Sequence, residues 1–391
     1  MKIADRVGRI QPSLTLAVSA KAQKLKASGV DVIAFGVGEP DFDTPAHIKA
    51  GAIAALERGV GKYTAVAGTL ELRAAAAAEL NAAHGTHHTA ESVIVSVGAK
   101  HSLFNLFMAM LDDGDEVVIP KPCWVSYPEL VMMAGGTPVL VDTRPDEEYR
   151  LDEAALRRAL SPKTRAILIN SPSNPTGAVY SAETMLGIAR VLRERPDVYV
   201  ITDDIYRRLV YGREWVSLAR VAPELAERVI LVDGVSKSYA MTGWRIGFCA
   251  GPRELVRAME TLQGQSTTNP AAIAQAAALA ALTGPGDSIV AMHAEFDKRR
   301  RVMVERLRAI AGVKLVEPHG AFYCFPDFSA FLDGKIKDDV QLAEWILERG
   351  RVALVPGSGF LAPGFARLSY ATSMKNIEEG LARIAAALGQ L

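Results

Sequence analysis

The sequence predicts an α/β fold, in which a mostly parallel sheet lies between helices and a smaller, discontinuous α+β domain completes the chain. Three observations support this prediction. Short apolar runs alternate with helical patterns through the middle of the chain, as is typical of parallel sheets. The chain has 391 residues, 49% of them hydrophobic, which is enough for more than one domain. After Gly284-Pro285-Gly286 the pattern changes to one long basic helix followed by short strands.

The large domain is expected to span residues 46–285. Amphipathic stretches such as Ala182–Arg193 predict its helices. Because ligands collect at the carboxyl ends of strands in such sheets, polar residues that follow the strands are candidates for a site. Its strands are predicted at Val93–Val97, Glu116–Ile119, Pro138–Val141, Ala166–Ile169, Val198–Ile201, Val229–Val232 and Ile246–Ala250.

Residues 286–391 are expected to form a linking helix and the small domain. The helix is predicted over Asp287–Ile310, and its Arg299-Arg300-Arg301 run is interpreted as a solvated face. Residues 1–45 are expected to hold an N-terminal arm and part of the small domain, because the segment Val32–Gly38 can pack with its strands. Those strands are predicted at Val313–Val316, Ala321–Phe325, Val352–Val355 and Ala366–Tyr370.

Composition excludes several classes of protein. Lys plus Arg and Asp plus Glu are both 44, and this balance argues against a broad nucleic-acid surface. The apolar stretch Ala271–Leu282 is too short to span a bilayer, and the first residues contain no apolar run typical of a signal peptide. We therefore expect a cytoplasmic protein that binds neither nucleic acid nor membrane.

Cysteine and histidine positions give no sign of a metal site. Cys123, Cys249 and Cys324 are far apart and odd in number, which fits a reducing compartment better than a disulfide framework. The residues His84, His87 and His88 are predicted to lie in a loop, without a carboxylate or cysteine that would complete a zinc site.

Three motifs that carry chemistry follow predicted strands. Lys237 ends the segment Gly234-Val235-Ser236-Lys237, and Arg245 lies eight residues further; an isolated lysine is usually a solvated surface residue. Asp203 and Tyr206 follow the strand at Val198–Ile201, where a carboxylate can also serve as a helix cap. Asn174 lies in an Asn-Pro-Thr-Gly segment that also suits a plain tight turn.

A further motif, Gly98-Ala99-Lys100, joins a strand to the helical pattern His101–Met110. Backbone N–H groups at the start of a helix suit a phosphate, although a plain strand–turn–helix junction is common. Trp124 follows another strand, and a tryptophan there can equally belong to the core.

In combination and order, these motifs resemble those of the class I aminotransferases, which have the fold type I of pyridoxal-phosphate enzymes. The resemblance runs from Arg9 to the C-terminus and is strongest toward the bacterial aspartate aminotransferases, some of which also use prephenate. It implies that Lys237 holds the cofactor as an imine and moves the substrate proton, and that Asp203 keeps the pyridine nitrogen protonated. Asn174 and Tyr206 would bond the phenolic oxygen, and Trp124 would stack on the ring. The phosphate would be bound by Gly98, Ala99, Lys100, Ser236 and Arg245.

The resemblance also implies a substrate and a partner. Arg367, aided by Gly38, Asn174 and Trp124, would bind the α-carboxylate of an amino acid or 2-oxo acid. Lys100, Ser13 and Thr15 would read a second carboxylate, although Ser13 and Thr15 can equally cap the helix predicted at Leu16–Lys26. Tyr63 would reach the phosphate of a second subunit, so that a homodimer shares its active sites.

The expected reaction is the transfer of an amino group from L-aspartate to 2-oxoglutarate. Prephenate-using relatives carry a lysine just before the Pro-Ser pair, where this chain has Gln11, so we expect weak or no activity with prephenate. Two other readings stay open: an aminotransferase of other specificity (prephenate, aromatic or alanine), and a pyridoxal-phosphate lyase or synthase. A non-catalytic sensor built on this fold is a third, but the family pattern begins too early to leave space for a DNA-binding module.

Overall fold

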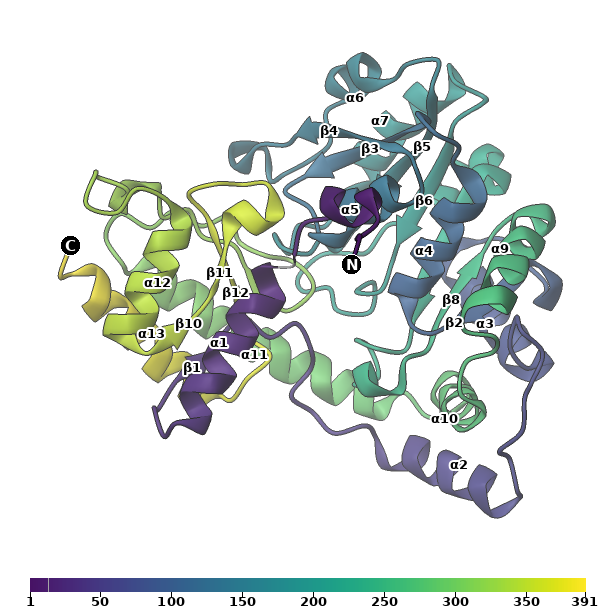
Figure 1. Ribbon diagram of the computed structural model, residues 1–391, viewed down its shortest axis with the longest axis horizontal. Coiled ribbons are helices and arrows are strands. Elements are labelled where there is room, and N and C mark those ends of the chain that lie inside the picture. The colour runs from purple at the N-terminus through teal and green to yellow at the C-terminus, as the bar shows by residue number, and fades with distance from the viewer. Residues whose placement is uncertain (13) are drawn as a thin grey trace.

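A computed structural model describes residues 1–12 and 14–391, and its ribbon divides into two lobes (Figure 1). The larger lobe is built on a seven-stranded sheet with the order β2-β8-β7-β6-β5-β3-β4. Strand β8 is antiparallel to both of its neighbours, and the remaining pairs are parallel. The strands are β2 (Val93–Ser96), β3 (Glu116–Lys121), β4 (Thr137–Asp142), β5 (Thr164–Ile169), β6 (Tyr199–Asp203), β7 (Val229–Gly234) and β8 (Gly247–Ala250). The predicted mostly parallel sheet is thus confirmed.

Helices cover both faces of this sheet because successive strand residues point to opposite sides. Val200 belongs to the core beneath α3, α7 and α10, whereas Ile201 belongs to the core beneath α4, α5 and α9. The helices of this lobe are α2 (Ala46–Glu57), α3 (Leu70–His84), α4 (Ala99–Met110), α5 (Ser126–Met133), α6 (Glu153–Ala159), α7 (Ala182–Arg193), α8 (Leu218–Val221), α9 (Arg253–Ser266) and α10 (Ala272–Thr283).

The smaller lobe combines segments from both ends of the chain. Strand β1 (Ile33–Ala34) pairs in parallel with β10 (Val352–Ala353), as the packing of Val32–Gly38 predicted. A second small sheet has the order β11-β12-β9 and is antiparallel. Its strands are β9 (Tyr323–Cys324), β11 (Val355–Pro356) and β12 (Ala366–Ser369), and the helices of this lobe are α1 (Leu14–Ala27), α11 (Asp287–Arg308), α12 (Asp339–Gly350) and α13 (Met374–Leu388).

Some predictions for the small lobe are wrong. The expected strand Val313–Val316 makes only one isolated bridge, from Lys314 to Asp327. Pro318 and Pro326 flank the two bridging segments, and a proline has no N–H group to continue a ladder. The strand expected at Val352–Val355 is divided between β10 and β11.

Two predictions about side chains are also wrong. Arg299 and Arg300 are 7% and 6% exposed rather than solvated. Each is buried with a carboxylate 2.7 Å away, Asp41 for Arg299 and Glu317 for Arg300. His84 is the last residue of α3 and not part of a loop, and it is 1% exposed.

The order of strands explains where a site can form. β5, β6 and β7 are adjacent and parallel, with Ile169 beside Thr202 and Asp203 beside Val232. Their carboxyl ends therefore lie at one edge of the sheet, and the residues that follow them meet there. No helix in the described ranges is long and apolar enough to cross a membrane.

Candidate active site

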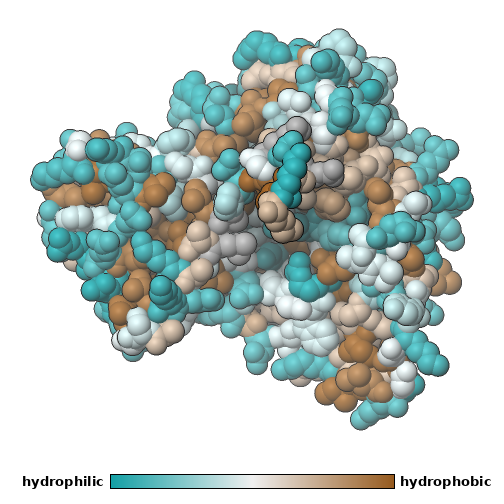
Figure 2. All heavy atoms as spheres, in the orientation of Figure 1, coloured by the Kyte–Doolittle hydropathy of each residue, from teal (hydrophilic) through white to brown (hydrophobic). Residues whose placement is uncertain are grey.

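The carboxyl edge of the large sheet borders a cavity of about 260 Å³. In Figure 2 the surface is hollowed between the two lobes. The cavity receives side chains from both lobes and from the first turn of α1. Its lining includes most of the predicted site residues: Thr15, Gly38, Ala99, Lys100, Trp124, Asn174, Asp203, Tyr206, Ser236, Lys237, Arg245 and Arg367.

Lys237 is the amine of this cavity. It lies three residues beyond the end of β7, and its Nζ donates a hydrogen bond of 2.6 Å to the carbonyl oxygen of Gly38. Burial, together with repulsion from Arg367 and Arg245, lowers the pKa of Lys237 to about 8, while the carboxylates of Glu39 and Asp203 oppose the shift. A lysine with such a pKa exchanges a proton near neutral pH, as covalent and acid–base catalysis require.

Asp203 is the carboxylate of the cavity, and it is held by a residue that the sequence analysis missed. The Tyr127 hydroxyl donates a hydrogen bond of 2.7 Å to Asp203 Oδ2, and both side chains are buried. Burial raises the pKa of Asp203 to about 6, and the bond from Tyr127 opposes this shift. Tyr127 lies in the same segment as Trp124, whose ring it contacts edge-on, but no local pattern marks a partner 76 residues away.

Asn174 and Arg367 meet across the two lobes. Arg367, on β12, is 2% exposed and donates hydrogen bonds to Asn174 Oδ1 (2.8 Å) and to the carbonyl oxygen of Gly36 (2.9 Å). Its Nε is buried and has no hydrogen-bond partner among the described residues. The guanidinium lies 4.4 Å from the centroid of the Tyr323 ring. Burial lowers the pKa of Arg367, and in the described part of the chain no carboxylate pairs with it, so this buried cation is available for an anionic ligand.

Tyr323 and Asn170, which were not predicted as site residues, complete this arrangement. The hydroxyls of Tyr206 and Tyr323 lie 2.8 Å apart, and burial raises the pKa of Tyr206 well above its ordinary value. Asn170, directly after β5, donates to the carbonyl oxygen of Asp203 (2.8 Å) and accepts from the backbone N–H of Asn174 (2.9 Å). Tyr323 lies in a segment that the sequence predicted only as a strand, and Asn170 lies between the strand predicted at Ala166–Ile169 and the turn at Asn174.

The start of α4 and the side chain of Arg245 form a place for an anion, here called the Gly98–Arg245 corner. Gly98 precedes the helix with φ of +86°, and a Cβ built there would lie 2.7 Å from Nη2 of Arg245. The backbone lies close to the guanidinium, and the positive φ favours glycine at this position. The first N–H groups of a helix lack intrahelical partners, so with Arg245 and the Ser236 hydroxyl they can bind a phosphate.

Lys100 and Thr15 also line the cavity. Lys100 Nζ is 4.8 Å from the centroid of the Trp124 ring, and burial, aided by Arg245, lowers its pKa. Ser13 lies outside the described residues. Tyr63 is 89% exposed and does not line the cavity of its own chain.

These groups fit pyridoxal phosphate. The cofactor needs an amine for its aldehyde, a carboxylate for its pyridine nitrogen, donors for its phenolic oxygen and a cradle for its phosphate. Lys237, Asp203, Tyr206 and Asn174 line one cavity and supply the first three, and the Gly98–Arg245 corner beside it supplies the fourth. In the described part of the chain, no group of three or more His, Cys, Asp or Glu side chains is arranged to hold a metal ion.

The fold and the cavity are those of an enzyme in which a mostly parallel sheet and a smaller lobe enclose a partly buried lysine. The chain belongs to the class I and II aminotransferases, because the model of that family matches residues 30–384. Members of this family are pyridoxal-phosphate enzymes.

Named relatives match along the whole chain. The aspartate/prephenate aminotransferase of Nitrosomonas europaea is 45% identical, over 99% of this chain and 100% of that protein. The aspartate aminotransferase of Geobacillus stearothermophilus is 45% identical, over 98% of both chains. The structure of Thermus thermophilus aspartate aminotransferase with maleate superposes with a TM-score of 0.94, at 46% identity, over 99% of this chain and 100% of that one. The resemblance seen in the sequence is thereby confirmed.

Proposed function

We propose that this chain transfers the amino group of L-aspartate to 2-oxoglutarate, giving oxaloacetate and L-glutamate, with pyridoxal 5′-phosphate on Lys237. The observation that carries the proposal is the meeting of Lys237, Asp203 and Arg367 around one cavity. The names of the relatives support the choice of aspartate.

The chemistry divides among these residues. When bound, pyridoxal phosphate supplies a protonated pyridine ring that withdraws electrons from the substrate Cα. Asp203 would hold the proton on the pyridine nitrogen, and Tyr127 keeps its carboxylate oriented. The neutral amine of Lys237 would act as the base that takes the proton from the substrate Cα. Because amino acid and oxo acid would use this site in turn, ping-pong kinetics are expected.

Arg367 orients the substrate. Its guanidinium has a planar fork that matches a carboxylate with two parallel hydrogen bonds. Asn174 and Gly36 already fix this fork, so little side-chain freedom is lost when the α-carboxylate binds. A Cβ at Gly38 would lie 3.1 Å from the Tyr323 hydroxyl, so the glycine keeps the entrance to Arg367 open.

Two further residues that line the cavity support a dicarboxylic substrate. Lys100 and Thr15 are these residues, and Lys100 supplies a positive charge. We propose that they bind the distal carboxylate of the substrate together with Ser13. The Thermus thermophilus structure was determined with maleate, which is also a dicarboxylate. Gln11 adds no positive charge to this end, so we propose that prephenate is a poor acceptor.

A panel of amino donors assayed with 2-oxoglutarate tests the substrate proposal. Aspartate should give the highest kcat/KM, with oxaloacetate and glutamate formed in equal amounts. Formation of elimination products in place of an oxo acid would indicate a lyase. The Lys237→Ala variant should lose both turnover and the visible absorbance of the bound cofactor, and a variant that kept both would refute the role of Lys237.

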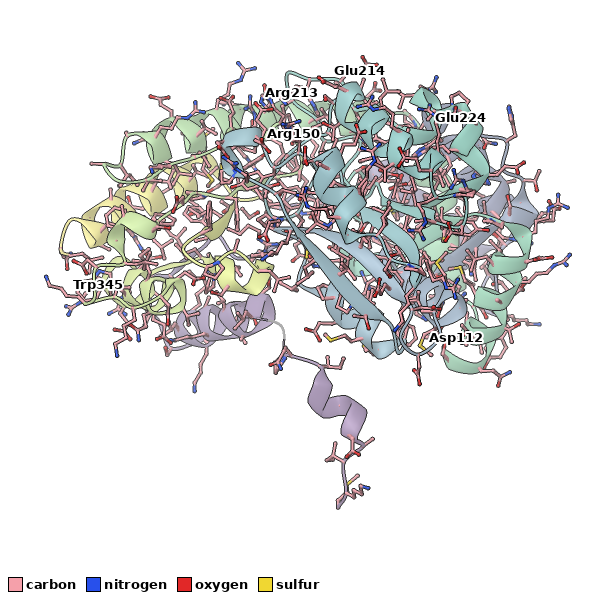
Figure 3. The ribbon with its side chains drawn as sticks, turned by 90° about the horizontal axis from the view of Figure 1, so that it is seen from above. Asp112, Arg150, Arg213, Glu214, Glu224 and Trp345 are labelled. Carbon is pink, nitrogen blue, oxygen red and sulfur yellow. The ribbon has the colours of Figure 1, made fainter. Side chains whose placement is uncertain are left out.

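We also propose that the enzyme is a homodimer with shared active sites. Ile53 and Leu56 are exposed on α2, where Figure 2 shows an apolar patch. The 3₁₀ helix Asp5–Arg9 projects away from the body in Figure 3, with Val7 57% exposed. These surfaces, and the exposed Tyr63, are suited to contact a second copy. Light scattering should give twice the chain mass, and Tyr63→Phe should weaken cofactor retention.

Domain limits and location complete the proposal. Residues 46–285 would form the cofactor-binding domain, with residues 1–45 and 286–391 forming the arm, the linking helix and the smaller domain. Buried, free Cys123, Cys249 and Cys324 support a reducing compartment, the cytoplasm. Limited proteolysis should cut first near these domain limits, and fractionation of cells should place the enzyme in the cytoplasm.

A further inference from the structure

Tyr323 lies where side chains of the two lobes meet. It belongs to β9 of the small lobe, is 1% exposed and lines the cavity. Its hydroxyl oxygen lies 2.8 Å from that of Tyr206, which follows β6 in the large lobe. A Cβ built on Gly38, whose carbonyl oxygen accepts from Lys237, would lie 3.1 Å from the same hydroxyl. A single hydroxyl group of the small lobe therefore reaches the residues around the amine of the cavity.

The ring of Tyr323 has a different partner from its hydroxyl. The guanidinium of Arg367 lies 4.4 Å from the centroid of this ring and 4.9 Å from that of Phe360. A cation is attracted to an aromatic face, so both rings help to hold Arg367 in place. The Tyr206 ring packs edge-on against the Tyr323 ring, with centroids 5.8 Å apart. Because ring and hydroxyl have separate contacts, a change to phenylalanine removes the contact of the hydroxyl alone.

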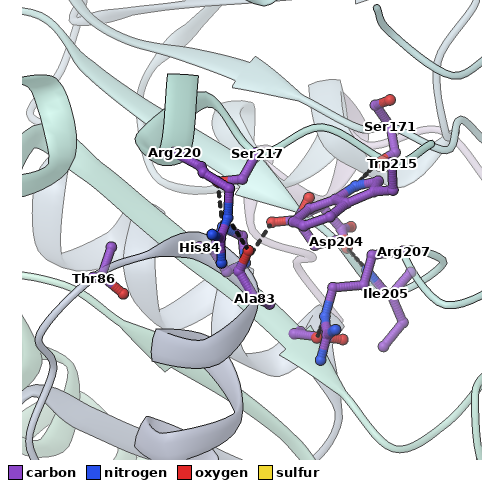
Figure 4. Close-up of polar contacts among 12 residues, drawn as sticks. Ala83, His84, Thr86, Ser171, Asp204, Ile205, Arg207, Trp215, Ser217 and Arg220 are labelled. Atoms are coloured by element: carbon purple, nitrogen blue, oxygen red, sulfur yellow. Dashed lines mark hydrogen bonds and ion pairs between the residues drawn. The ribbon is translucent and has the colours of Figure 1, made fainter. Parts of the chain in front are cut away.

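The turn that carries Tyr206 is held by residues that do not line the cavity. The backbone N–H of Arg207 donates to the carbonyl oxygen of Asp204 at 2.8 Å. The Arg207 side chain donates to Asp233 at 2.7 Å and also pairs with Glu79. Figure 4 shows Asp204 and Arg207 among the polar contacts beside β6. The Tyr206 hydroxyl therefore keeps its place, and what can change is the direction of its proton.

The two buried hydroxyl groups of Tyr206 and Tyr323 share one hydrogen bond. A tyrosine hydroxyl has one proton to donate and can also accept. Neither of these two hydroxyls bonds any other described residue. One of the two protons lies between the oxygens, and the other is free for a ligand in the cavity that both residues line. While their bond lasts, the pair can therefore donate to a ligand from only one of its hydroxyls.

The expected ligand decides which of the two protons is free. The phenolic oxygen of pyridoxal phosphate needs donors, and Tyr206 and Asn174 are the residues of the cavity that supply them. With its bond to Tyr323 kept, Tyr206 can donate to this oxygen only if it accepts from Tyr323. Burial raises the pKa of both hydroxyls, and that of Tyr206 lies well above its ordinary value. The rise is smaller at Tyr323, where the Arg367 cation opposes it, so Tyr323 is the stronger acid and the better donor of the pair.

We propose that Tyr323 is a positioning residue that acts through Tyr206. Its hydroxyl donates to the Tyr206 oxygen, and the Tyr206 proton is thereby directed at the phenolic oxygen of the cofactor. Hydrogen bonds in a chain polarise one another, so this donation also strengthens the bond that Tyr206 makes. The inference rests on the proposed function, in which this cavity binds pyridoxal phosphate.

Tyr323→Phe tests the inference, because it removes the hydroxyl and keeps the ring beside Arg367. A weaker bond from Tyr206 leaves more negative charge on the phenolic oxygen, and this charge favours the protonated form of the lysine-bound cofactor. The pKa of the visible absorbance of that cofactor should therefore rise by about 0.3 or more, which is about a twofold change in the protonation equilibrium. The dissociation constant of the cofactor, measured by equilibrium dialysis, should rise about twofold.

Tyr370→Phe is the matched control. Tyr370 is another buried tyrosine of the small lobe, its hydroxyl donates to the carbonyl oxygen of Ala321 at 3.1 Å, and it does not line the cavity. This change should leave both values as they are in the parent chain. The double variant Tyr206→Phe/Tyr323→Phe should match Tyr206→Phe alone, since Tyr323 acts through Tyr206. A shift from Tyr323→Phe that is equally large without the Tyr206 hydroxyl would overturn the proposal, and so would a Tyr323→Phe variant with the pKa of the parent.

Replacement of Tyr323 by 3-fluorotyrosine gives a readout of opposite sign. The fluorine makes the hydroxyl more acidic and a stronger donor, so the pKa of the visible absorbance should fall below that of the parent. A rise, or no change, would contradict the inference. A parent chain that does not bind pyridoxal phosphate would refute the proposed function and this inference together. A parent chain that binds it, with neither shift in the two variants of Tyr323, would refute this inference alone.

Discussion

The lowered pKa of Lys237 gives a prediction that needs no mutation, because pH itself is the perturbation. Only the neutral amine can attack an aldehyde. The pKa of about 8, against an ordinary value of 10.5, comes first from burial and then from Arg367 and Arg245. Apoenzyme should therefore capture pyridoxal phosphate faster as the pH rises from 6, with a plateau above pH 8.

The magnitude follows from the shift. A difference of about 2.5 between the two pKa values corresponds to roughly 300-fold more neutral amine at pH 7 than an ordinary lysine would provide, or about 3 kcal/mol. The direction of the pH dependence follows because burial disfavours the charged form of the amine. The amine is neutral above pH 8 and takes up a proton as the pH falls, so capture slows. Arg367→Gln should move the midpoint upward, because one of the cations that repel the ammonium is lost.

Stopped-flow absorbance of apoenzyme mixed with excess pyridoxal phosphate measures this profile. Lys237→Ala should show no fast phase at any pH, which separates Lys237 from the surface lysines. A capture rate that continues to rise tenfold per pH unit up to pH 10 would mean an ordinary lysine, and would refute the account of how the cavity tunes Lys237.

Three substitutions test other parts of the site. Arg367→Ala should lower kcat/KM for aspartate about tenfold or more, since a hydrogen bond to a charged group contributes roughly 1.5–3 kcal/mol; an unchanged value would exclude Arg367 from carboxylate binding. Lys100→Ala should lower turnover of aspartate more than that of alanine, and equal losses would contradict a role in reading the distal carboxylate. Gly98→Ala should weaken cofactor binding and cost about 1–3 kcal/mol in urea unfolding, because it adds a Cβ 2.7 Å from Arg245 at positive φ; a neutral effect on both would show that the corner tolerates a side chain.

The sequence predicted the large sheet well because its strands are buried on both faces and read as continuous apolar runs. Val200 and Ile201 enter different cores, yet both had to be apolar. The small lobe was harder. Its strands are two to four residues long, and a mostly apolar run such as Val313–Val316 can be partly buried while making only an isolated bridge.

Site residues that belong to a local motif could be predicted from the sequence. Contacts between side chains of two distant motifs could not. Lys237, Asp203 and Asn174 each follow a strand, and the resemblance supplied their roles. The bond from Tyr127 to Asp203 and that from Arg367 to Asn174 join residues 76 and 193 positions apart, and no pattern along the chain encodes such pairs. His84 was wrongly placed in a loop for another reason, because the alanine-rich α3 that ends on it has no strong periodicity of apolar residues.

The adjacency of β5, β6 and β7 has a consequence for how activity is lost. Asn174, Asp203 and Lys237 are tied to neighbouring strands of one buried sheet, whereas Arg367 belongs to the small antiparallel sheet of the other lobe. Regions with fewer and shorter ladders open at lower free energy than a central sheet. Mild denaturant should therefore abolish binding of the substrate carboxylate while Lys237 still retains the cofactor. Amide hydrogens of β12 should exchange before those of β6. Substrate recognition and cofactor retention would then fail in two separate steps.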